Sequence, residues 1–225
     1  MSAAETPTPE LPRRGKRTRH ALLAAAHHLL ADRSIDSLAV DDIVQSAGVA
    51  KGSFYNHFVD KQELASIIRK DIRKEIEAIV TQVNEHVEDP VARTVRGFAV
   101  YVGYILASQH RAQVTLRLNT GLTSASNSLN EGIKRDIAAG LRSGRFVVPS
   151  VQAGALFVIG TCQIVLMHAV ENVDQADIVT IAQQLGTLML RGLGVPLSES
   201  EAATASAIHE LVIKPAPGRK ITPYS

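Results

Sequence analysis

The sequence has 225 residues, of which 45% are hydrophobic and 20% are charged, as in soluble globular proteins with a sizeable core. The net charge of +2 does not by itself indicate a nucleic-acid partner. The single cysteine, Cys162, excludes an internal disulfide and fits a reducing cytoplasm. The opening stretch MSAAETPTPELP has no apolar run, so we expect no secretory signal there.

A basic cluster follows this Pro-rich lead-in and consists of Arg13, Arg14, Lys16, Arg17 and Arg19. Composition alone leaves open whether the cluster is a solvated, disordered tail or a contact for a polyanion. From Arg17 to Ala31 the apolar residues recur at spacings of three and four, which predicts an amphipathic helix.

Two short helices, over residues 40–46 and 50–57, are predicted next, joined by a turn in which Gly48 can adopt positive φ. Phe54 and Phe58 are four residues apart, so they share one helical face and can pack into a core. Packed on the preceding helix, the pair forms a helix-turn-helix unit, whose second helix lies in the DNA major groove. Such turns also occur in unrelated bundles, so DNA binding stays open from the pattern alone. The outward-facing polar residues are Lys51, Ser53, Tyr55, Asn56 and His57, and Gly52 allows a close backbone approach.

The rest of the chain is also predicted to be helical. Asp60 and Glu63 form a capping-box-like pair at the start of a long helix that runs from Lys61 into the eighties, and Pro90 begins another. Further helices are predicted at about 126–141, 150–171, 174–192 and 198–213. The final stretch, KPAPGRKITPYS, is typical of a disordered tail. No segment alternates as a strand would, so the expected fold class is all-α.

Residues 146–170 contain no Asp, Glu, Lys or Arg and are long enough to span a bilayer. However, the stretch has no aromatic belt at its ends, and it is interrupted by Pro149, Gln152, Gln163 and His168. A helix buried within the protein or within a dimer explains this composition better, and we expect no membrane association.

The stretch DDIVQSAGVAKGSFYNHFVDKQEL resembles the TetR (tetracycline repressor-like) family of bacterial regulators. The family pattern is Ile-Ala-x-x-Ala-Gly-Val, then Ser-Lys-Gly-Thr-Leu-Tyr-x-His-Phe and x-x-Lys-x-x-Leu. It is matched at Ile43, Ala47, Gly48, Val49, Lys51, Gly52, Tyr55, His57, Phe58, Lys61 and Leu64. The resemblance implies an all-α protein with an N-terminal three-helix helix-turn-helix DNA-binding domain, followed by a larger helical ligand-binding and dimerisation domain.

By this resemblance, the second short helix and its surroundings contact double-stranded operator DNA. Residues 51–53 would meet bases or phosphates, Tyr55, His57 and Lys61 would reach phosphates, and the basic arm would lie along the adjacent backbone or minor groove. His57 could instead be a capping or packing residue, and Asn56 could be merely solvated. The expected DNA contacts are Arg13, Arg14, Arg17, Gln45, Lys51, Gly52, Ser53, Tyr55, Asn56, His57 and Lys61.

One departure from the family concerns the start of the first short helix. The family commonly has a threonine at this N-cap that donates to a phosphate, but this sequence has Ala39, so the cap and the contact are absent. Loss of such a cap typically costs about 1 kcal/mol. Asp41 and Asp42 suit the helix dipole but would repel a phosphate that they faced.

The resemblance also implies a homodimer, because one helix-turn-helix unit reads only a half-site. The last two long helices would form a four-helix interface with their symmetry mates, and packing within one chain is the alternative. A pocket in the helical domain would bind an unidentified small-molecule effector and thereby change the separation of the two DNA-binding heads. Its candidate lining residues are Tyr101, Tyr104, Arg117, Asn119, Phe157, Cys162, Met167 and His168.

Enzymatic and metal-binding functions find little support. His168 and Glu171 are three residues apart, but no second such pair, cysteine cluster, phosphate loop or nucleophile elbow accompanies them. We therefore predict a cytoplasmic transcriptional regulator with no enzymatic activity, cofactor or metal, in the form of a repressor that a small molecule releases from its operator. The alternative is a helical small-molecule-binding protein or enzyme that retained the fold without DNA binding.

The domains expected from this reading are a flexible basic arm, a DNA-binding domain, a ligand-binding and dimerisation domain, and a C-terminal tail that is in part helical. Their predicted ranges are 1–16, 17–64, 65–195 and 196–225.

Overall fold

The computed structural model describes residues 13–118, 130–172 and 174–215. Within these ranges the chain forms helices and connecting turns and contains no β-strand, so the predicted all-α class is confirmed. The described residues divide into two compact units, one that ends at Ile68 and one that begins at Arg69.

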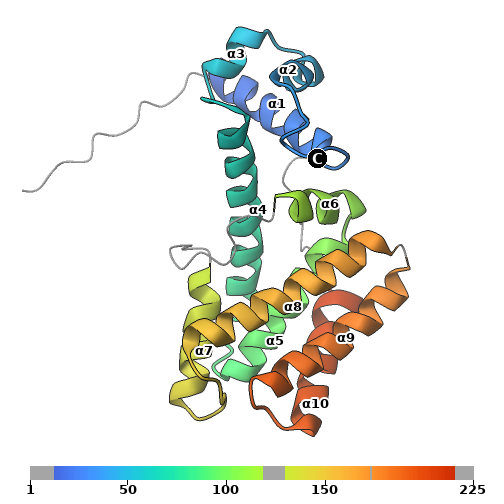
Figure 1. Cartoon of the computed structure of the whole chain (residues 1–225). Helices are drawn as coiled ribbons and strands as arrows, with labels where there is room; N and C mark the ends of the chain where they lie inside the picture. The colour runs from blue at the N-terminus through green and yellow to red at the C-terminus, as the bar shows by residue number, and fades with distance from the viewer. Residues whose placement is uncertain (1–12, 119–129, 173, 216–225) are drawn as a thin grey trace, which may run out of the picture. The chain divides into compact units, whose positions relative to one another are not determined.

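The smaller unit contains α1 (Arg13–Leu29), α2 (Val40–Ala47), α3 (Lys51–Tyr55) and the beginning of α4 (Lys61–Val83), as Figure 1 shows. Phe54 and Phe58 are both buried, and their ring centroids are 5.5 Å apart. The prediction that these two rings face the core is therefore confirmed. The other large, fully buried side chains of this unit are Leu22, Leu30, Leu38, Ile43, Leu64 and Ile68.

The turn between α2 and α3 is closed by Gly48, whose φ of 65° lies in the left-handed region. A residue with a Cβ is disfavoured in that region, whereas glycine is not. The amide of Gly48 donates to the carbonyl of Gln45, and the amide of Val49 donates to the carbonyl of Val44. The chain thus reverses within a few residues, as the sequence predicts.

The basic cluster at the N-terminal end differs from the expectation of a flexible arm. Residues 13–16 belong to the first turn of α1, which therefore begins four residues before the predicted start at Arg17. The rest of the predicted arm, residues 1–12, lies outside the described residues.

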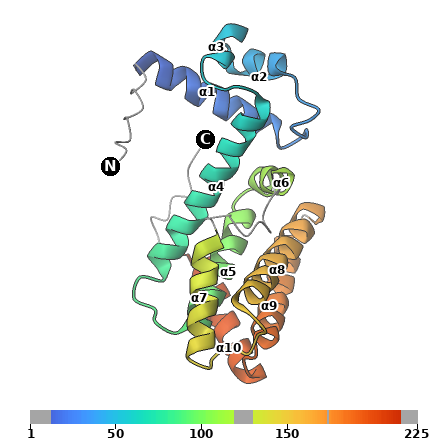
Figure 2. The same ribbon diagram turned by 60° about the vertical axis from the view of Figure 1, so that its left-hand side comes forward.

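The larger unit is built around α5 (Pro90–Leu106), which packs against each of the five helices that follow it. Figure 2 shows α5 behind α7 and α8. The five helices are α6 (Gln109–Arg117), α7 (Glu131–Arg142), α8 (Val151–Glu171), α9 (Gln175–Gly192) and α10 (Leu197–Ile208). The unit ends in a π-helical turn at His209–Ile213. Because α5 has neighbours all around it, eleven of its seventeen residues are buried, including Phe98 and Tyr104.

Side-chain caps fix the starts of three helices in this unit. The carboxylate of Asp89 accepts from the amide of Ala92 at the start of α5, and the hydroxyl of Ser150 accepts from Ala153 at the start of α8. Asp174 caps α9 in the same way. These groups satisfy amides that lack a partner in the first turn, so the helix starts predicted at positions 90, 150 and 174 are met within one residue.

The short helix α6 was not predicted from the sequence. Most of its residues are polar, and its buried side chains are limited to Ala112, Val114 and Thr115, so it has no continuous apolar stripe. Tertiary contacts hold it instead, since it packs against α5 and α8. On it, Arg111 lies over the ring of Tyr104 at 5.3 Å from the ring centroid.

Helix α8 is the one helix in the described part of the chain that is long and apolar enough to cross a membrane. One side of it packs inside the larger unit through residues such as Val158, Val165 and Leu166. The other side leaves Phe157 and Ile164 exposed. The helix thus has a side that packs within the larger unit and an outward apolar side.

Candidate functional site

Helix α3 presents a polar edge opposite its buried phenylalanine. Lys51, Gly52, Tyr55 and Asn56 are exposed, with 56% of Tyr55 accessible, while Ser53 is half-buried. The Tyr55 ring contacts the Phe54 ring edge to face, with the centroids 5.4 Å apart, so the exposed ring packs against a core residue. An exposed aromatic ring held in this way can make contacts without a large loss of conformational entropy.

The start of α2 shows how the helix begins without a threonine cap. Ala39 occupies the N-cap position and offers no side-chain acceptor, but the carboxylate of Asp42 accepts a hydrogen bond from the Ala39 amide at 3.0 Å. Asp42 also pairs with Arg33 at 3.0 Å. The hydrogen bond from Ala39, assisted by Arg33, lowers the pKa of Asp42. Asp42 therefore supplies one half of a capping box and is engaged within its own unit.

Asp41 is paired as well, since it accepts from the ammonium group of Lys51 at 2.9–3.0 Å. The hydrogen bond to Asp41 raises the pKa of Lys51, so the lysine stays charged at the start of α3. The pair joins the N-terminal ends of α2 and α3. An exposed pair of this kind exchanges partners easily, so Lys51 stays available for an anion.

Lys61 has an unexpected environment at the start of α4. Its ammonium group donates to the backbone carbonyls of Asp36 and Leu38, both at 2.8 Å. The neighbouring Gln62 donates to the carboxylate of Asp36 at 2.9 Å. Both contacts hold the segment that leads into α2, so the structure gives Lys61 a positioning role within the unit.

The remaining predicted DNA contacts lie on three elements of the same unit. Arg13, Arg14 and Arg17 stand on α1, and Gln45 is exposed on α2. His57 follows α3, half-buried against the ring of Phe58, and its buried Nδ1 has no hydrogen-bond partner among the described residues. The polar edge of α3 and the exposed polar side chains of α1 and α2 thus belong to one small helical unit.

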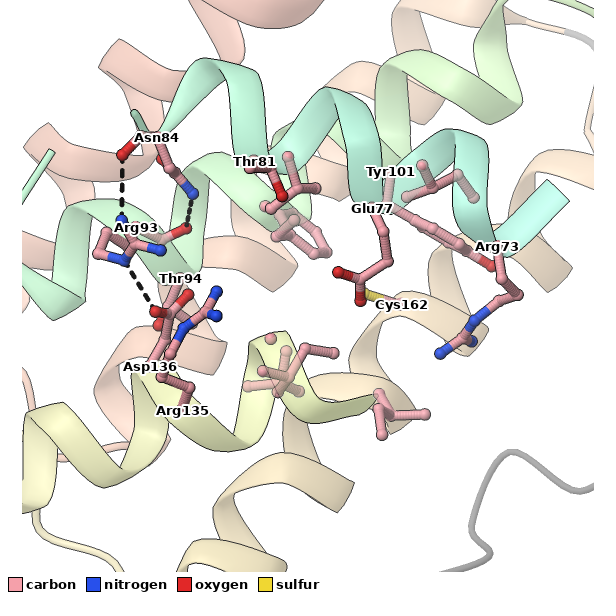
Figure 3. A pocket seen from close by; sticks show the side chains of 18 of the residues that line it. Arg73, Glu77, Thr81, Asn84, Arg93, Thr94, Tyr101, Arg135, Asp136 and Cys162 are labelled. Atoms are coloured by element: carbon pink, nitrogen blue, oxygen red, sulfur yellow. Dashed lines mark hydrogen bonds and ion pairs between the residues drawn. The ribbon is translucent and has the colours of Figure 1, made fainter. Parts of the chain in front are cut away.

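The larger unit contains a cavity of about 770 Å³, the α4–α8 cavity, which is lined by α4, α5, α7 and α8. Its size falls within the range of pockets for drug-sized ligands. The apolar walls come mainly from Ile76, Val80, Phe98, Ile133, Val158 and Ile159. Figure 3 shows the polar side chains that accompany these walls, with Glu77 of α4 pointing into the space.

Two charged groups of the cavity wall are held by the protein itself. Arg93 donates to the carboxylate of Asp136 at 2.7 Å and to the carbonyls of Asn84 and Val87, both at 3.0 Å (Figure 3). Arg73 donates to the side-chain oxygen of Asn130 at 2.6 Å. Figure 3 shows Arg93 and Arg73 at opposite ends of the cavity, so these bonds hold a charged group in place at each end.

Glu77 and Cys162 are affected by burial. Desolvation raises the pKa of the Glu77 carboxyl, although Arg73 and Arg135 oppose this shift. Burial raises the pKa of the Cys162 thiol to about 12, so this group stays protonated at neutral pH and is a poor nucleophile. Burial disfavours the charged form of each group.

Of the predicted pocket residues, Tyr101 and Cys162 line this cavity. Tyr104 faces a second cavity, of about 580 Å³, and donates to Glu75 at 3.2 Å. Phe157 and Met167 are exposed on the outward side of α8, and His168 contacts Asp177 of α9 at 3.0 Å. Arg117 is exposed at the end of α6, and Asn119 lies outside the described residues.

Sequence reasoning missed the contributions of α4 and α7 to the cavity. Arg73 and Glu77 are four residues apart, so they share one helical face with Ile76 and Val80 beside them. Charged residues among the apolar positions of an amphipathic helix were the available signal.

Among the residues that the structure describes, no group of three or more His, Cys, Asp or Glu side chains is placed to hold a metal ion.

The fold and these two sites define a helix-turn-helix protein with an additional helical unit that contains a cavity. Residues 22–66 match the family model described as bacterial regulatory proteins, tetR family. Residues 89–206 match the model described as tetracyclin repressor-like, C-terminal domain. The chain therefore belongs to the TetR family, as the motif around α3 predicts.

Individual relatives are more distant. The chain is 28% identical over 109 residues to the HTH-type transcriptional repressor KstR2 of Mycolicibacterium smegmatis, a match of 48% of this chain and 52% of that protein. The chain thus spans about half the length of this relative.

Two solved structures show the same fold at lower identity. RolR in complex with resorcinol is 21% identical, with a TM-score of 0.61 over 88% of this chain and 98% of that one. FadR from Bacillus subtilis in complex with stearoyl-CoA is 18% identical, with a TM-score of 0.63 over 76% of this chain and 97% of that one.

Proposed function

We propose that the protein is a homodimeric, cytoplasmic transcriptional repressor that binds operator DNA through α3 and is released by a small molecule bound in the α4–α8 cavity. The single observation that carries the proposal is the division of α3 into a buried and an exposed side. Phe54 is fully buried, while Lys51, Tyr55 and Asn56 are exposed. A recognition helix needs this division, because the side chains that contact bases must project outward from the protein surface.

Membership of the TetR family supports DNA binding, and the engagement of Asp42 removes one objection to it. An acidic side chain that faced the phosphates would weaken binding, but Asp42 turns back to its own N-cap. Asp41 is neutralised by Lys51. In the chain without DNA the start of α2 therefore carries no unpaired negative charge, despite the missing threonine.

The outward side of α8 and α9 supports a dimer. Phe157, Ile164 and Met167 of α8 and Leu188 of α9 are large apolar side chains that are between 45% and 55% exposed in the single chain. Gly160 lies between two of them and has open space beside it, so a second helix can approach closely. Contiguous apolar side chains on a surface mark an interaction site.

Two of the similar structures hold small organic ligands, resorcinol in RolR and stearoyl-CoA in FadR. Together with the volume of the α4–α8 cavity, this supports an effector role for the cavity. The two ligands differ greatly in size and chemistry, so the effector of this chain has to be inferred from its own residues.

DNA binding is tested by selecting bound fragments from genomic DNA and then measuring affinity by fluorescence anisotropy over a range of salt concentrations. We expect log affinity to fall linearly with log salt, with a slope of about −0.9 for each phosphate contacted. Asn56→Ala should weaken specific binding, and Lys70→Ala, an exposed change outside the α3 surface, should not. Absence of a specific complex at every salt concentration would favour the alternative of a ligand-binding protein that has lost DNA binding.

Dimerisation is tested by light scattering of the wild type and of Ile164→Glu. A charge in the centre of the apolar surface should give a monomer and weaken operator binding, because only one half-site is then read at a time. Gln183→Glu, an exposed change elsewhere on α9, serves as the matched control. A wild-type mass of one chain at micromolar concentration would contradict the dimer.

A further inference from the structure

The polar groups of the α4–α8 cavity differ in whether the protein itself satisfies them. Arg93 and Asp136 bond to each other, and Arg73 bonds to Asn130. Glu77 and Arg135 also line the cavity, but within the described part of the chain neither forms a hydrogen bond or an ion pair. Glu77 is half-buried, while Arg135 is exposed at the edge.

The carboxylate of Glu77 lies over the backbone of α7. A Cβ added to Gly132 would be 3.1 Å from the Glu77 Oε2 atom, so the missing side chain at Gly132 leaves room for the carboxylate. In Figure 3 this carboxylate points into the cavity. The cavity thus has an acceptor that points into it, and its walls also include the apolar side chains of Ile76, Phe98 and Ile159.

A half-buried acceptor with no hydrogen bond is unfavourable, because it has lost part of its hydration without gaining a protein donor. The raised pKa of Glu77 agrees with this position. A ligand that brings a donor to the carboxylate would remove this penalty. The geometry therefore favours a ligand with an O–H or N–H group at the point where it reaches Glu77.

The charges around the cavity indicate whether the preferred ligand should be charged or uncharged. Arg73 and Arg135 carry positive charges, Glu77 and Glu85 carry negative charges, and Arg93 and Asp136 neutralise each other. The formal sum is zero. A ligand anion would meet the Glu77 carboxylate, and a ligand cation would lie in the field of the two arginines. An uncharged ligand avoids both costs.

We propose that the cavity binds an uncharged, largely apolar molecule that carries a hydroxyl group, and that this hydroxyl donates a hydrogen bond to Glu77. The inference rests on the proposed ligand role of the cavity and specifies its chemistry. It excludes free carboxylates and amines as preferred ligands. The apolar walls take up the hydrocarbon part of the molecule, and the hydroxyl fixes its orientation.

The test is isothermal titration calorimetry on the full chain without DNA, with four probes that share one ring system: 2-naphthol, naphthalene, 2-naphthoate and 2-naphthylmethylamine. At neutral pH the wild type should bind the naphthol most tightly. Loss of a hydrogen bond to a charged acceptor corresponds to a loss in affinity of about ten- to a hundredfold, which is the preference expected over naphthalene.

Variants then assign the preference to one residue. Glu77→Leu should reduce naphthol affinity by about ten- to a hundredfold. Glu77→Gln, which keeps the shape but loses the charge, should reduce naphthol affinity less and strengthen binding of the naphthoate. Glu85→Gln is the matched control, because Glu85 also lines the cavity but is exposed. Circular dichroism establishes that each variant is folded.

Three results would overturn the inference: tighter wild-type binding of the naphthoate or the amine, equal naphthol affinity in the wild type and Glu77→Leu, or no binding by any of the four probes. The proposed repressor function fails separately. If the naphthol binds in a Glu77-dependent way but never releases the operator, ligand-controlled repression is contradicted and the ligand class stands.

Discussion

Replacement of Lys61 by methionine would separate a positioning role of this residue from a role in phosphate binding. The change removes the ammonium group and keeps most of the side-chain volume. In the structure this group donates to the carbonyls of Asp36 and Leu38, both at 2.8 Å. The Lys61→Met variant leaves both carbonyls, which lie just before α2, without this donor.

The expected magnitude follows from these two bonds. A hydrogen bond that involves a charged group contributes about 1.5–3 kcal/mol when it is well shielded. Lys61 is only half-buried, so solvent screening reduces both contributions, and we expect a total loss of about 2 kcal/mol. For a chain of this size each kcal/mol corresponds to about 2–4 °C, so the melting temperature should fall by about 4–8 °C.

The assay combines thermal unfolding followed by circular dichroism with operator binding by anisotropy. Lys70→Met is the control, because Lys70 is also on α4 but is exposed, and its melting temperature should match that of the wild type. A different outcome would refute the reasoning. If Lys61→Met melts like the wild type but binds all duplexes more weakly, with a salt slope reduced by about 0.9, Lys61 holds a phosphate instead.

Four further substitutions test the fold and the cavity by thermal unfolding. Gly48→Ala should lower the free energy of unfolding by about 1–2 kcal/mol, because Gly48 has a positive φ. Gly52→Ala should instead stabilise the protein slightly, because Gly52 lies in helical backbone with open space around it. Equal effects of the two changes would contradict the turn geometry. Gly140→Ala should lower the free energy of unfolding by about 1–3 kcal/mol, because the new methyl group would overlap the ring of Phe146. An unchanged melting temperature would show that the ring can move. Burial raises the pKa of Glu77, so the native state binds this proton more tightly than the unfolded chain does. The resulting stability is present at low pH and is lost as the pH rises through the raised pKa. Glu77→Gln should therefore raise the melting temperature at neutral pH and change it little near pH 4, and a lower melting temperature at neutral pH would contradict this environment.

The sequence was sufficient for those parts of the fold that depend on local patterns. The long helices were predictable because their apolar residues recur at helical spacing, and the turn at Gly48 was predictable because glycine tolerates positive φ. The inward orientation of Phe54 and Phe58 followed from their spacing alone. Helix α6 was missed because tertiary contacts, and not its own sequence pattern, hold it in place.

The sites were less predictable, because they depend on contacts between residues that are far apart in the chain. No local pattern shows that Lys61 bonds to carbonyls more than twenty residues earlier, or that Asp41 pairs with Lys51. The cavity posed the same difficulty. The spacing of Glu77 within α4 shows which helical face it shares, but the open space above Gly132 exists only once α4, α5, α7 and α8 have packed together.

The first turn of α1 has a further consequence for the state of the protein away from DNA. This turn contains Arg13, Arg14 and Lys16 and has no acidic residue, so its positive charges are placed at the positive end of the helix dipole. Positive charges at this end of a helix are unfavourable, so the turn should fray in dilute salt, and a row of phosphates beside it would stabilise it. Backbone amides in this turn should then exchange with deuterium more slowly on the operator than in free solution. Their exchange rate would therefore report whether the protein is bound to its operator.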